Sequence, residues 1–260
     1  LSSDEVATPP AVANQVLDLL PAEVWSNKEL KWLDPACKTG VFLREAARRL
    51  MEGLKDSLPD ETERRKHIFT KMLHGYALTE LTAQMSRRSV YYNKDASSKT
   101  SSVVQFSRPE GNIWFSGDDH SYNADRKCGV CGAGEEIFGA LGNRERHAYD
   151  FIHRLGDTMK FDVIVGNPPY QLDAAGFGRQ ATPIYDLFVE QAIRLQPRYI
   201  AMIIPSRWFT GGMGLSRFRD KMLNTRHLKS IYDFSNSEWL FPGVQVKGGV
   251  CYFLWDNSWD

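Results

Sequence analysis

The sequence of 260 residues predicts an α/β fold, in which a mostly parallel sheet is flanked by helices and ends in an antiparallel strand. Residues 161–166 form an apolar, largely β-branched run, which is typical of a buried central strand. Residues 32–33 predict a short strand, joined by a tight turn to an amphipathic helix that begins at Val41. Two apolar runs on either side of Phe241-Pro242-Gly243 indicate a final antiparallel pair.

The other elements follow in order along the chain. A turn at Thr8-Pro9-Pro10 precedes a short helix that Pro21 ends, because proline suits only the opening positions of a helix. Residues 74–78 predict a second strand followed by a helix, and residues 112–115 predict a third strand. A helix from Ile184 and a buried strand from Tyr199 complete the alternation that favours a parallel sheet.

The composition excludes several classes of protein. With 42% hydrophobic residues the chain can bury a full core, and it lacks both a signal-peptide pattern and the roughly 18 consecutive apolar residues of a membrane helix. We therefore expect a soluble cytoplasmic protein. Lys plus Arg equals Asp plus Glu at 32 each, so the chain has no net charge that would attract DNA phosphates. We expect the basic residues that recognise DNA to lie outside this chain. Four unevenly spaced cysteines do not suggest a secreted disulfide framework.

The central strand ends in Gly166-Asn167-Pro168-Pro169-Tyr170. Two prolines cannot continue a sheet ladder, so the chain leaves the sheet with a stiffened backbone. The Asn167 side-chain oxygen and the Pro168 carbonyl could accept both N–H bonds of a planar amine and free its lone pair for attack. Tyr170 could stack on the ring that carries the amine. The alternative is a turn that merely ends the strand.

Residues 166–170 resemble the catalytic signature of S-adenosylmethionine-dependent amino-methyltransferases, above all those acting on adenine in DNA. The resemblance implies a Rossmann-like methyltransferase fold. It also implies that the double-proline turn binds the target amine, that Tyr170 stacks on a flipped base, and that Phe241 faces the base from the other side. Phe241 also fits an ordinary core position. The catalytic residues predicted in this way are Asn167, Pro168, Pro169, Tyr170 and Phe241.

A strand, a turn of small residues and a helix N-terminus together form a cradle of free backbone N–H groups, and residues 34–40 have this pattern. In the methyltransferase family the corresponding loop holds S-adenosylmethionine. Here Lys38 stands where a glycine is usual, and Ala77 stands where a ribose-binding carboxylate is usual, with Glu80 as its substitute or as a helix-dipole partner. The predicted cofactor-binding residues are Thr8, Asp34, Ala36, Gly40, Glu80, Asp118 and Asn167.

Residues 118–155 are long for a connection in a compact domain, and they contain Cys128-Gly-Val-Cys131 followed by His147 and His153. This spacing falls within the range of structural zinc sites, and a small insert without its own core gains folding free energy from a metal. His120 is a fifth candidate ligand, so which four bind the metal stays open. The alternative is a pair of free thiols with surface histidines.

The whole chain, 1–260, is thus predicted to be the catalytic domain of a type II restriction-modification methyltransferase with the gamma-type motif order. In this order a target-recognition domain follows, and we expect it outside this chain. The expected reaction is direct methyl transfer to the 6-amino group of adenine in double-stranded DNA, with a cognate or fused nuclease as partner. The alternatives are another amine (protein glutamine, RNA guanine or cytosine N4) or a catalytically silent recognition subunit.

Overall fold

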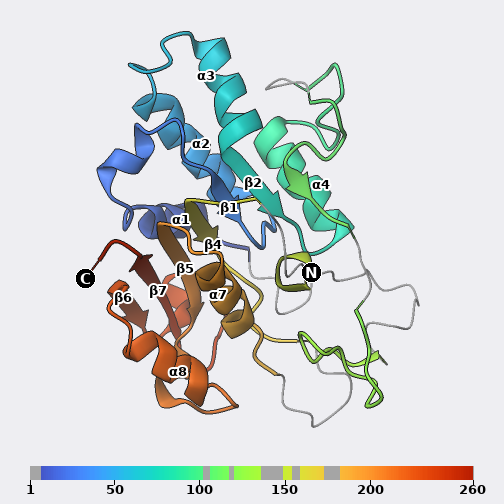
Figure 1. Cartoon of the computed structure of the whole chain (residues 1–260), viewed down its shortest axis with the longest axis vertical. Coiled ribbons are helices and arrows are strands. Elements are labelled where there is room, and N and C mark those ends of the chain that lie inside the picture. The colour runs from blue at the N-terminus through green and yellow to red at the C-terminus, as the bar shows by residue number, and fades with distance from the viewer. Residues whose placement is uncertain are drawn as a thin grey trace.

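The structure is a computed structural model that describes residues 7–101, 106–116, 120–135, 149–153, 159–172 and 182–259. Its strands form one seven-stranded sheet in the order β3-β2-β1-β4-β5-β7-β6 (Figure 1). They are β1 (Trp32–Asp34), β2 (Leu73–Tyr76), β3 (Ile113–Trp114), β4 (Val163–Gly166), β5 (Tyr199–Pro205), β6 (Leu228–Phe234) and β7 (Val250–Asp256). The first five run parallel, and β7 lies antiparallel between β5 and β6. The predicted fold class is confirmed.

Helices connect these strands. The α-helices are α1 (Pro10–Leu17), α2 (Val41–Gly53), α3 (Glu61–His67), α4 (Glu80–Tyr91), α6 (Asp150–His153), α7 (Tyr185–Arg194) and α8 (Ser216–Leu223). Shorter turns are the 3₁₀ helices η1 (Ala22–Trp25), η3 (Ser206–Thr210) and η4 (Ser237–Trp239) and the π-helix η2 (Ile68–Met72). Among the described residues, no helix is both long and apolar enough to cross a bilayer.

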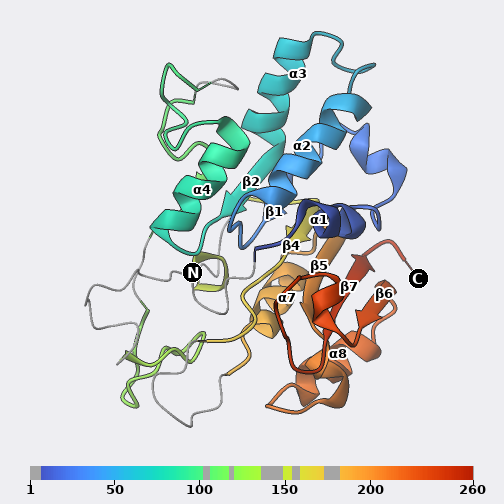
Figure 2. The same cartoon turned by 180° about the vertical axis from the view of Figure 1, so that it is seen from behind.

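The buried strands divide their side chains between two cores, because successive residues of a strand point to opposite faces of the sheet. Val163 and Val165 face the core that α1, α2 and α4 cover, whereas Ile164 faces the core that α6, α7 and α8 cover. Figures 1 and 2 show α1 and α2 on one face of the sheet and α7 on the other. The apolar run that predicted a central strand is therefore buried on both sides.

The strand order reverses at β1, which has β2 on one side and β4 on the other. In open α/β sheets, ligands bind in the crevice at such a point, beyond the carboxyl ends of the strands. Asp34 ends β1 and Gly166 ends β4, so both predicted turns open into this crevice. A Cβ atom on Gly166 would lie only 2.8 Å from Asp34 Oδ1, and this close approach requires glycine.

Candidate functional site

A small hollow lies at the C-terminal ends of β1 and β4. Its wall is formed by Thr8, Asp34, Ala36, Lys38, Thr39, Gly40, Val41, Phe42 and Asn167. The hollow brings together these residues predicted for the cofactor or for catalysis: Thr8, Asp34, Ala36, Gly40 and Asn167. Thr8 and Asn167 are 159 positions apart in the sequence, so the site exists only in the folded chain.

Hydrogen bonds hold the loop after β1 in place. The Asp34 Oδ1 atom accepts the backbone N–H of Ala36 at 3.1 Å, which closes a tight turn directly after the strand. The backbone N–H of Cys37 donates to the Tyr76 carbonyl at the end of β2, at 2.8 Å. The Cys37 side chain is fully buried. The loop is thereby tied to the neighbouring strand.

The second half of the loop is tied to α4. The Ser86 hydroxyl donates to the carbonyls of Cys37 and Lys38 at 2.9 and 3.2 Å. Gly40 has φ of +73°, which suits glycine, whereas Lys38 is not among the described non-glycine residues with positive φ. Lysine in place of the usual glycine therefore does not strain this loop.

Helix α2 begins directly beyond Gly40. Its first helical hydrogen bond runs from the Arg44 N–H to the Gly40 carbonyl at 2.9 Å, so the N–H groups of Val41 and Phe42 have no partner within the helix. Both residues line the hollow. The N-terminus of a 13-residue helix therefore gives this side of the hollow a partial positive charge.

Asn167 is the polar group that the double-proline turn adds to the hollow. Its side chain is only 3% exposed, and its Nδ2 donates to the Thr8 hydroxyl at 3.0 Å. This bond leaves the buried Oδ1 without a hydrogen-bond partner. The Tyr170 hydroxyl is near the Asn167 amide but makes no hydrogen bond in this geometry. A buried acceptor with no partner is costly, which marks Oδ1 as a ligand-binding atom.

Two groups of opposite charge share the hollow with Asn167. Burial raises the pKa of Asp34 to about 7, against the lowering effects of the Ala36 N–H and of the Lys38 ammonium. Lys38 is 7% exposed, and its Nζ atom lies 5.8 Å from the centroid of the Tyr170 ring. A carboxyl and an ammonium therefore lie close to the predicted amine-binding turn.

The two predicted aromatic residues lie in the core that α1, α2 and α4 cover. Tyr170 and Phe241 belong to the same hydrophobic cluster and are 8% and 1% exposed. The Tyr170 carbonyl accepts the N–H of Ile184 at 3.2 Å, and the Phe241 N–H donates to the Ser237 carbonyl at 2.8 Å. Pro168 and Pro169 are buried between Asn167 and Tyr170. The enclosed Phe241 ring also agrees with the core interpretation of this residue.

The structure does not bring every predicted residue to the hollow. Glu80 is exposed in the first turn of α4, where its carboxylate accepts the Gln84 amide at 3.1 Å, and it does not line the hollow. Asp118 lies outside the described residues. Lys38 lines the hollow, but the sequence pointed to it only as a departure from the family's loop pattern and not as a residue of the site. The signal available in the sequence was a charged residue in a turn otherwise made of small ones.

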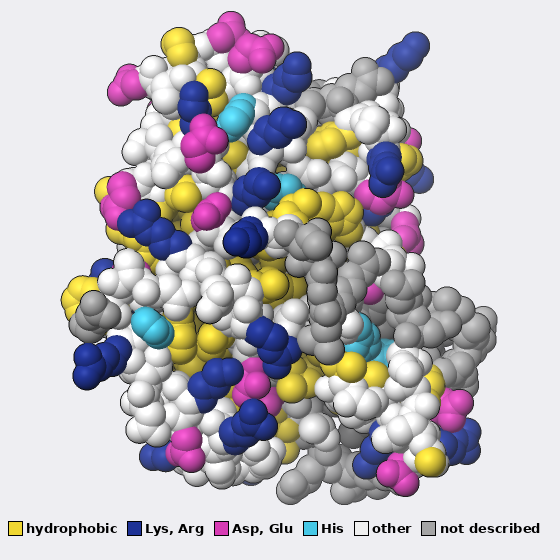
Figure 3. Space-filling model, viewed as in Figure 1, with side chains coloured by type: hydrophobic (Ala, Val, Ile, Leu, Met, Phe, Trp, Pro, Cys, Tyr) yellow, Lys and Arg dark blue, Asp and Glu magenta, His cyan; other side chains and the backbone are white. Residues whose placement is uncertain are grey.

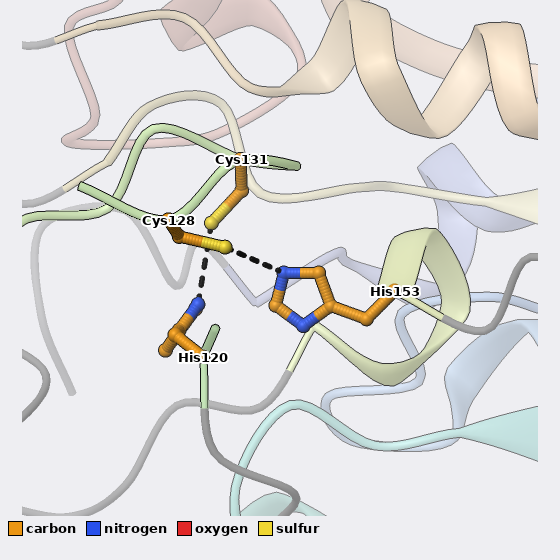
Figure 4. Close-up of side chains that lie close together, drawn as sticks. All are labelled: His120, Cys128, Cys131 and His153. Atoms are coloured by element: carbon orange, nitrogen blue, oxygen red, sulfur yellow. Dashed lines mark hydrogen bonds between the residues drawn. The ribbon is translucent and has the colours of Figure 1, made fainter. Parts of the chain in front are cut away.

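A second cluster of side chains lies in the insert. His120, Cys128, Cys131 and His153 point toward one another (Figure 4). Their ligand atoms all lie within 4.8 Å of one another, with 3.6 Å from Cys128 Sγ to His153 Nε2 and 3.3 Å from Cys131 Sγ to His120 Nδ1. His147 lies outside the described residues. Four of the five predicted ligands thus share one site.

The insert docks on the sheet through α6. The Asp150 carboxylate accepts both the backbone N–H and the hydroxyl of Ser116, each at 2.8 Å, directly after β3. Phe151 stacks on Phe188 of α7 with ring centroids 5.9 Å apart. His153 belongs to the same short helix, so the Cys/His cluster is linked to the edge of the sheet that carries β2 and β3.

Comparisons with known proteins agree with this architecture. Residues 71–241 match the model of the family described as Eco57I restriction-modification methylase. An "uncharacterized adenine-specific methylase" of Mycoplasma pneumoniae is 39% identical over an alignment 289 positions long, which covers 100% of this chain and 68% of that protein.

Two solved structures show the same fold. The nuclease-deletion mutant of the Type ISP restriction-modification enzyme LlaGI, in complex with a DNA substrate mimic, superposes with a TM-score of 0.62 at 15% identity, over 98% of this chain and 23% of that one. A putative class I S-adenosylmethionine-dependent methyltransferase of Listeria monocytogenes gives 0.51 at 16% identity, over 98% and 62%. This chain is therefore much shorter than the LlaGI chain.

These comparisons do not separate the types of restriction-modification system, so the assignment to type II stays a prediction. The prediction of a restriction-modification methyltransferase is confirmed, because the family match covers residues 71–241 and the Mycoplasma relative aligns with the whole chain. The chain belongs to the Eco57I restriction-modification methylase family.

Proposed function

We propose that this chain transfers a methyl group from S-adenosylmethionine to the 6-amino group of adenine in double-stranded DNA. The observation that carries the proposal is the Asn167 Oδ1 atom, a buried acceptor without a partner that shares a hollow with the loop after β1. An acceptor in this position can take an N–H bond from an amine. The adenine-specific relative from Mycoplasma supports the choice of base.

Asn167 acts with the backbone of its own turn. The Oδ1 atom and the Pro168 carbonyl accept the two N–H bonds of the target amine, which draws the nitrogen toward tetrahedral geometry and makes its lone pair available. Thr8 assists because its hydroxyl accepts from Nδ2 and leaves Oδ1 free for the amine. The prolines limit the motion of the turn, so the acceptors are held in advance of binding.

The chemistry of the residues that line the hollow supports binding of the amino-acid end of S-adenosylmethionine. Its wall offers an ammonium, a carboxyl, two hydroxyls and the N-terminus of α2, which suit a ligand end that carries both charges. When bound, S-adenosylmethionine supplies a methyl group activated by its positive sulfur. Lys38 and Ala77, which depart from the family's pattern, are the two sequence features that favour a catalytically silent subunit. The backbone at Lys38 is unstrained, so the first of them no longer supports that alternative.

DNA is the proposed carrier of the adenine. A base in a duplex must leave its stack to reach such a turn, at a cost of a few kcal/mol. Stacking on Tyr170, with Phe241 as the proposed second aromatic, offsets part of this cost. The LlaGI enzyme was solved with a DNA substrate mimic, which supports DNA as the substrate and a restriction-modification nuclease as the partner.

The test is Asn167→Ala, with Asn27→Ala at an exposed site as the matched control. The Asn167→Ala variant loses the acceptor for the amine together with the hydrogen bond to Thr8, and we expect transfer of labelled methyl to DNA to fall by about 10² to 10³-fold, with nearly unchanged cofactor affinity. Digestion of the methylated DNA should yield N6-methyladenine. Equal loss of transfer and of cofactor affinity would make Asn167 structural, and another methylated nucleoside would overturn the choice of adenine.

We further propose that residues 118–155 form a zinc-binding insert with His120, Cys128, Cys131 and His153 as ligands. Tetrahedral Zn–S and Zn–N bonds of about 2.3 and 2.1 Å separate neighbouring ligand atoms by about 3.5 Å. The separations of 3.3 and 3.6 Å agree with this value. A closed Cys₂His₂ set leaves no position for water, so the role would be structural, as the link from Asp150 to Ser116 also suggests.

Metal analysis of the purified chain tests the zinc proposal. We expect one zinc per chain in the wild type and in Cys251→Ala, a buried cysteine outside the cluster. Cys131→Ala should lose the zinc, because three ligands bind it far less tightly. His147→Ala should keep it, since four places are already filled. Zinc loss in His147→Ala with retention in His120→Ala would replace His120 by His147 in the ligand set.

A further inference from the structure

Arg207 carries a guanidinium that forms no ion pair with any described residue. It lies in η3, directly after β5, and is half-buried. Its Nη1 atom donates to Met213 Sδ at 2.6 Å, and a thioether sulfur is a weak acceptor. The carboxylate of Asp233 accepts the neighbouring Ser206 hydroxyl instead. Because a guanidinium has five N–H donors, most of those of Arg207 can still bind an anion.

The backbone on either side of Arg207 is held in place. The N–H of Ser206 donates to the Gly249 carbonyl at 3.1 Å, and the Thr210 hydroxyl donates to the Arg207 carbonyl at 3.0 Å. The Trp208 side chain is fully buried. Arg207 therefore starts from a fixed backbone, which lowers the entropy that is lost when its side chain binds a ligand.

The register of the sheet places Arg207 beyond the double-proline turn. Gly166 of β4 pairs with Met202 of β5, and β5 continues to Pro205, three residues further. At about 3.3 Å per residue, β5 extends about 10 Å past the level at which β4 ends. The hollow lies on the other side of β4, beside β1, and Arg207 does not line it. Arg207 is therefore outside the proposed cofactor site, at the edge where the backbone of a flipped nucleotide has to remain.

The connection between β6 and β7 passes Arg207 at this edge. A Cβ atom on Gly248 would lie 3.9 Å from the Cα atom of Arg207. Lys247 comes directly before this glycine and is exposed. The same connection carries Trp239, which is 71% exposed, and one acidic residue, the exposed Glu238. Two basic side chains and an exposed aromatic ring thus share the edge of the sheet to which the catalytic turn belongs.

We propose that Arg207 and Lys247 bind phosphates of the DNA strand that carries the flipped adenine, an inference that rests on the proposed function. Residues 206–219 contain three arginines and no Asp or Glu, so this segment is positive although the whole chain is neutral. A guanidinium matches two oxygens of one phosphate, and Trp239 offers a face on which an unstacked base can lie. This combination fits a nucleic acid better than a free phosphate.

The salt dependence of duplex binding tests this inference, because each neutralised phosphate releases counterions. Fluorescence anisotropy with a labelled duplex of mixed sequence measures binding by the wild type, Arg207→Met and Lys247→Met. Arg207→Lys keeps the charge, and Arg226→Met removes an exposed arginine just before β6, at the opposite edge of the sheet. Arg207→Gln replaces Arg207→Met if that variant does not fold, and thermal unfolding reports on the fold of each.

We expect Arg207→Met and Lys247→Met each to reduce the slope of log K against log salt by about 0.9 and to weaken binding about tenfold. Arg207→Lys and Arg226→Met should keep the slope of the wild type. In the methyl-transfer assay, Arg207→Met should raise the KM for DNA about tenfold, with kcat and the affinity for S-adenosylmethionine nearly unchanged. An unchanged slope in Arg207→Met, or an equal reduction in Arg226→Met, would overturn the inference.

Failure of this inference can be told apart from failure of the proposed function. A wild type that binds duplex with a slope dependent on Arg207 but methylates no base would refute the methyltransferase proposal and leave the phosphate contact standing. A wild type that methylates adenine, while Arg207→Met keeps both its slope and its KM, would refute only the role of Arg207. Equal loss of duplex and S-adenosylmethionine affinity in Arg207→Met would make Arg207 structural.

Discussion

At the scale of single residues, Asp34 carries a carboxyl group whose ionisation its surroundings oppose. The side chain is buried at the end of β1, and only the Ala36 N–H and the Lys38 ammonium favour the charged form. Together these effects put the pKa at about 7, above the 3.8 of an unperturbed aspartate. The group is therefore held in the hollow at a cost in stability that depends on pH.

The sign of this dependence follows from proton binding. Between pH 3.8 and about 7, the folded protein holds a proton on Asp34 that the unfolded chain has lost. The contribution of Asp34 to stability therefore decreases as the pH rises through this window and is constant above it. From pH 5 to pH 8 we expect a loss of about 3 kcal/mol in the free energy of unfolding from this group.

Asp34→Asn tests this expectation, because asparagine can still accept the Ala36 N–H and does not ionise. Urea unfolding at pH 5 and pH 8 should show a smaller loss of stability in the variant than in the wild type, by about 3 kcal/mol. The matched control is Asp56→Asn at an exposed position. Parallel pH profiles for the wild type and Asp34→Asn would mean that Asp34 does not titrate in this window.

At the scale of elements, apolar periodicity identified the strands and the amphipathic helices. The segment α3 with η2 was not predicted, because the α3 sequence ETERRKH has no apolar stripe to reveal it. A capping signal was nevertheless present, since the Asp60 side chain accepts the N–H of Glu63 at 2.8 Å. Helix-start signals would therefore have found an element that hydrophobic periodicity could not.

The Cys/His cluster illustrates a second limit at this scale. The spacing after Cys128 and Cys131 pointed first to His147 and His153, and His120 was only a fifth candidate. His120 precedes both cysteines in the sequence, and its ring reaches Cys131 because the chain doubles back through the antiparallel bridge between Tyr122 and Cys128. Linear spacing cannot express such a reversal of the chain.

At the scale of the whole molecule, charge is balanced. Lys plus Arg and Asp plus Glu number 32 each, and Figure 3 shows both signs interspersed on the face that it presents. Sequence-independent affinity for DNA comes mainly from Lys and Arg side chains that neutralise the phosphates. We therefore expect this chain by itself to bind random-sequence duplex weakly, with a Kd of about 10 µM or above at physiological salt.

Fluorescence anisotropy with a labelled duplex measures this affinity across a series of salt concentrations. Few released counterions should give a shallow slope of log K against log salt, no steeper than about −3. Submicromolar binding with a steep slope would reveal a concentrated basic surface that the overall balance of charge conceals.

Short-range chemistry is what the sequence by itself determined about this protein: strand runs, the double-proline turn at Asn167 and the small-residue loop at Asp34. Proline and glycine constrain the backbone within a few residues, so their effects can be recognised locally. Only the tertiary structure decided that Thr8 holds the Asn167 amide, that Lys38 enters the hollow and that His120 joins the cysteines. These contacts depend on the order of strands in the sheet and on the path of the chain between them, and no local preference encodes either.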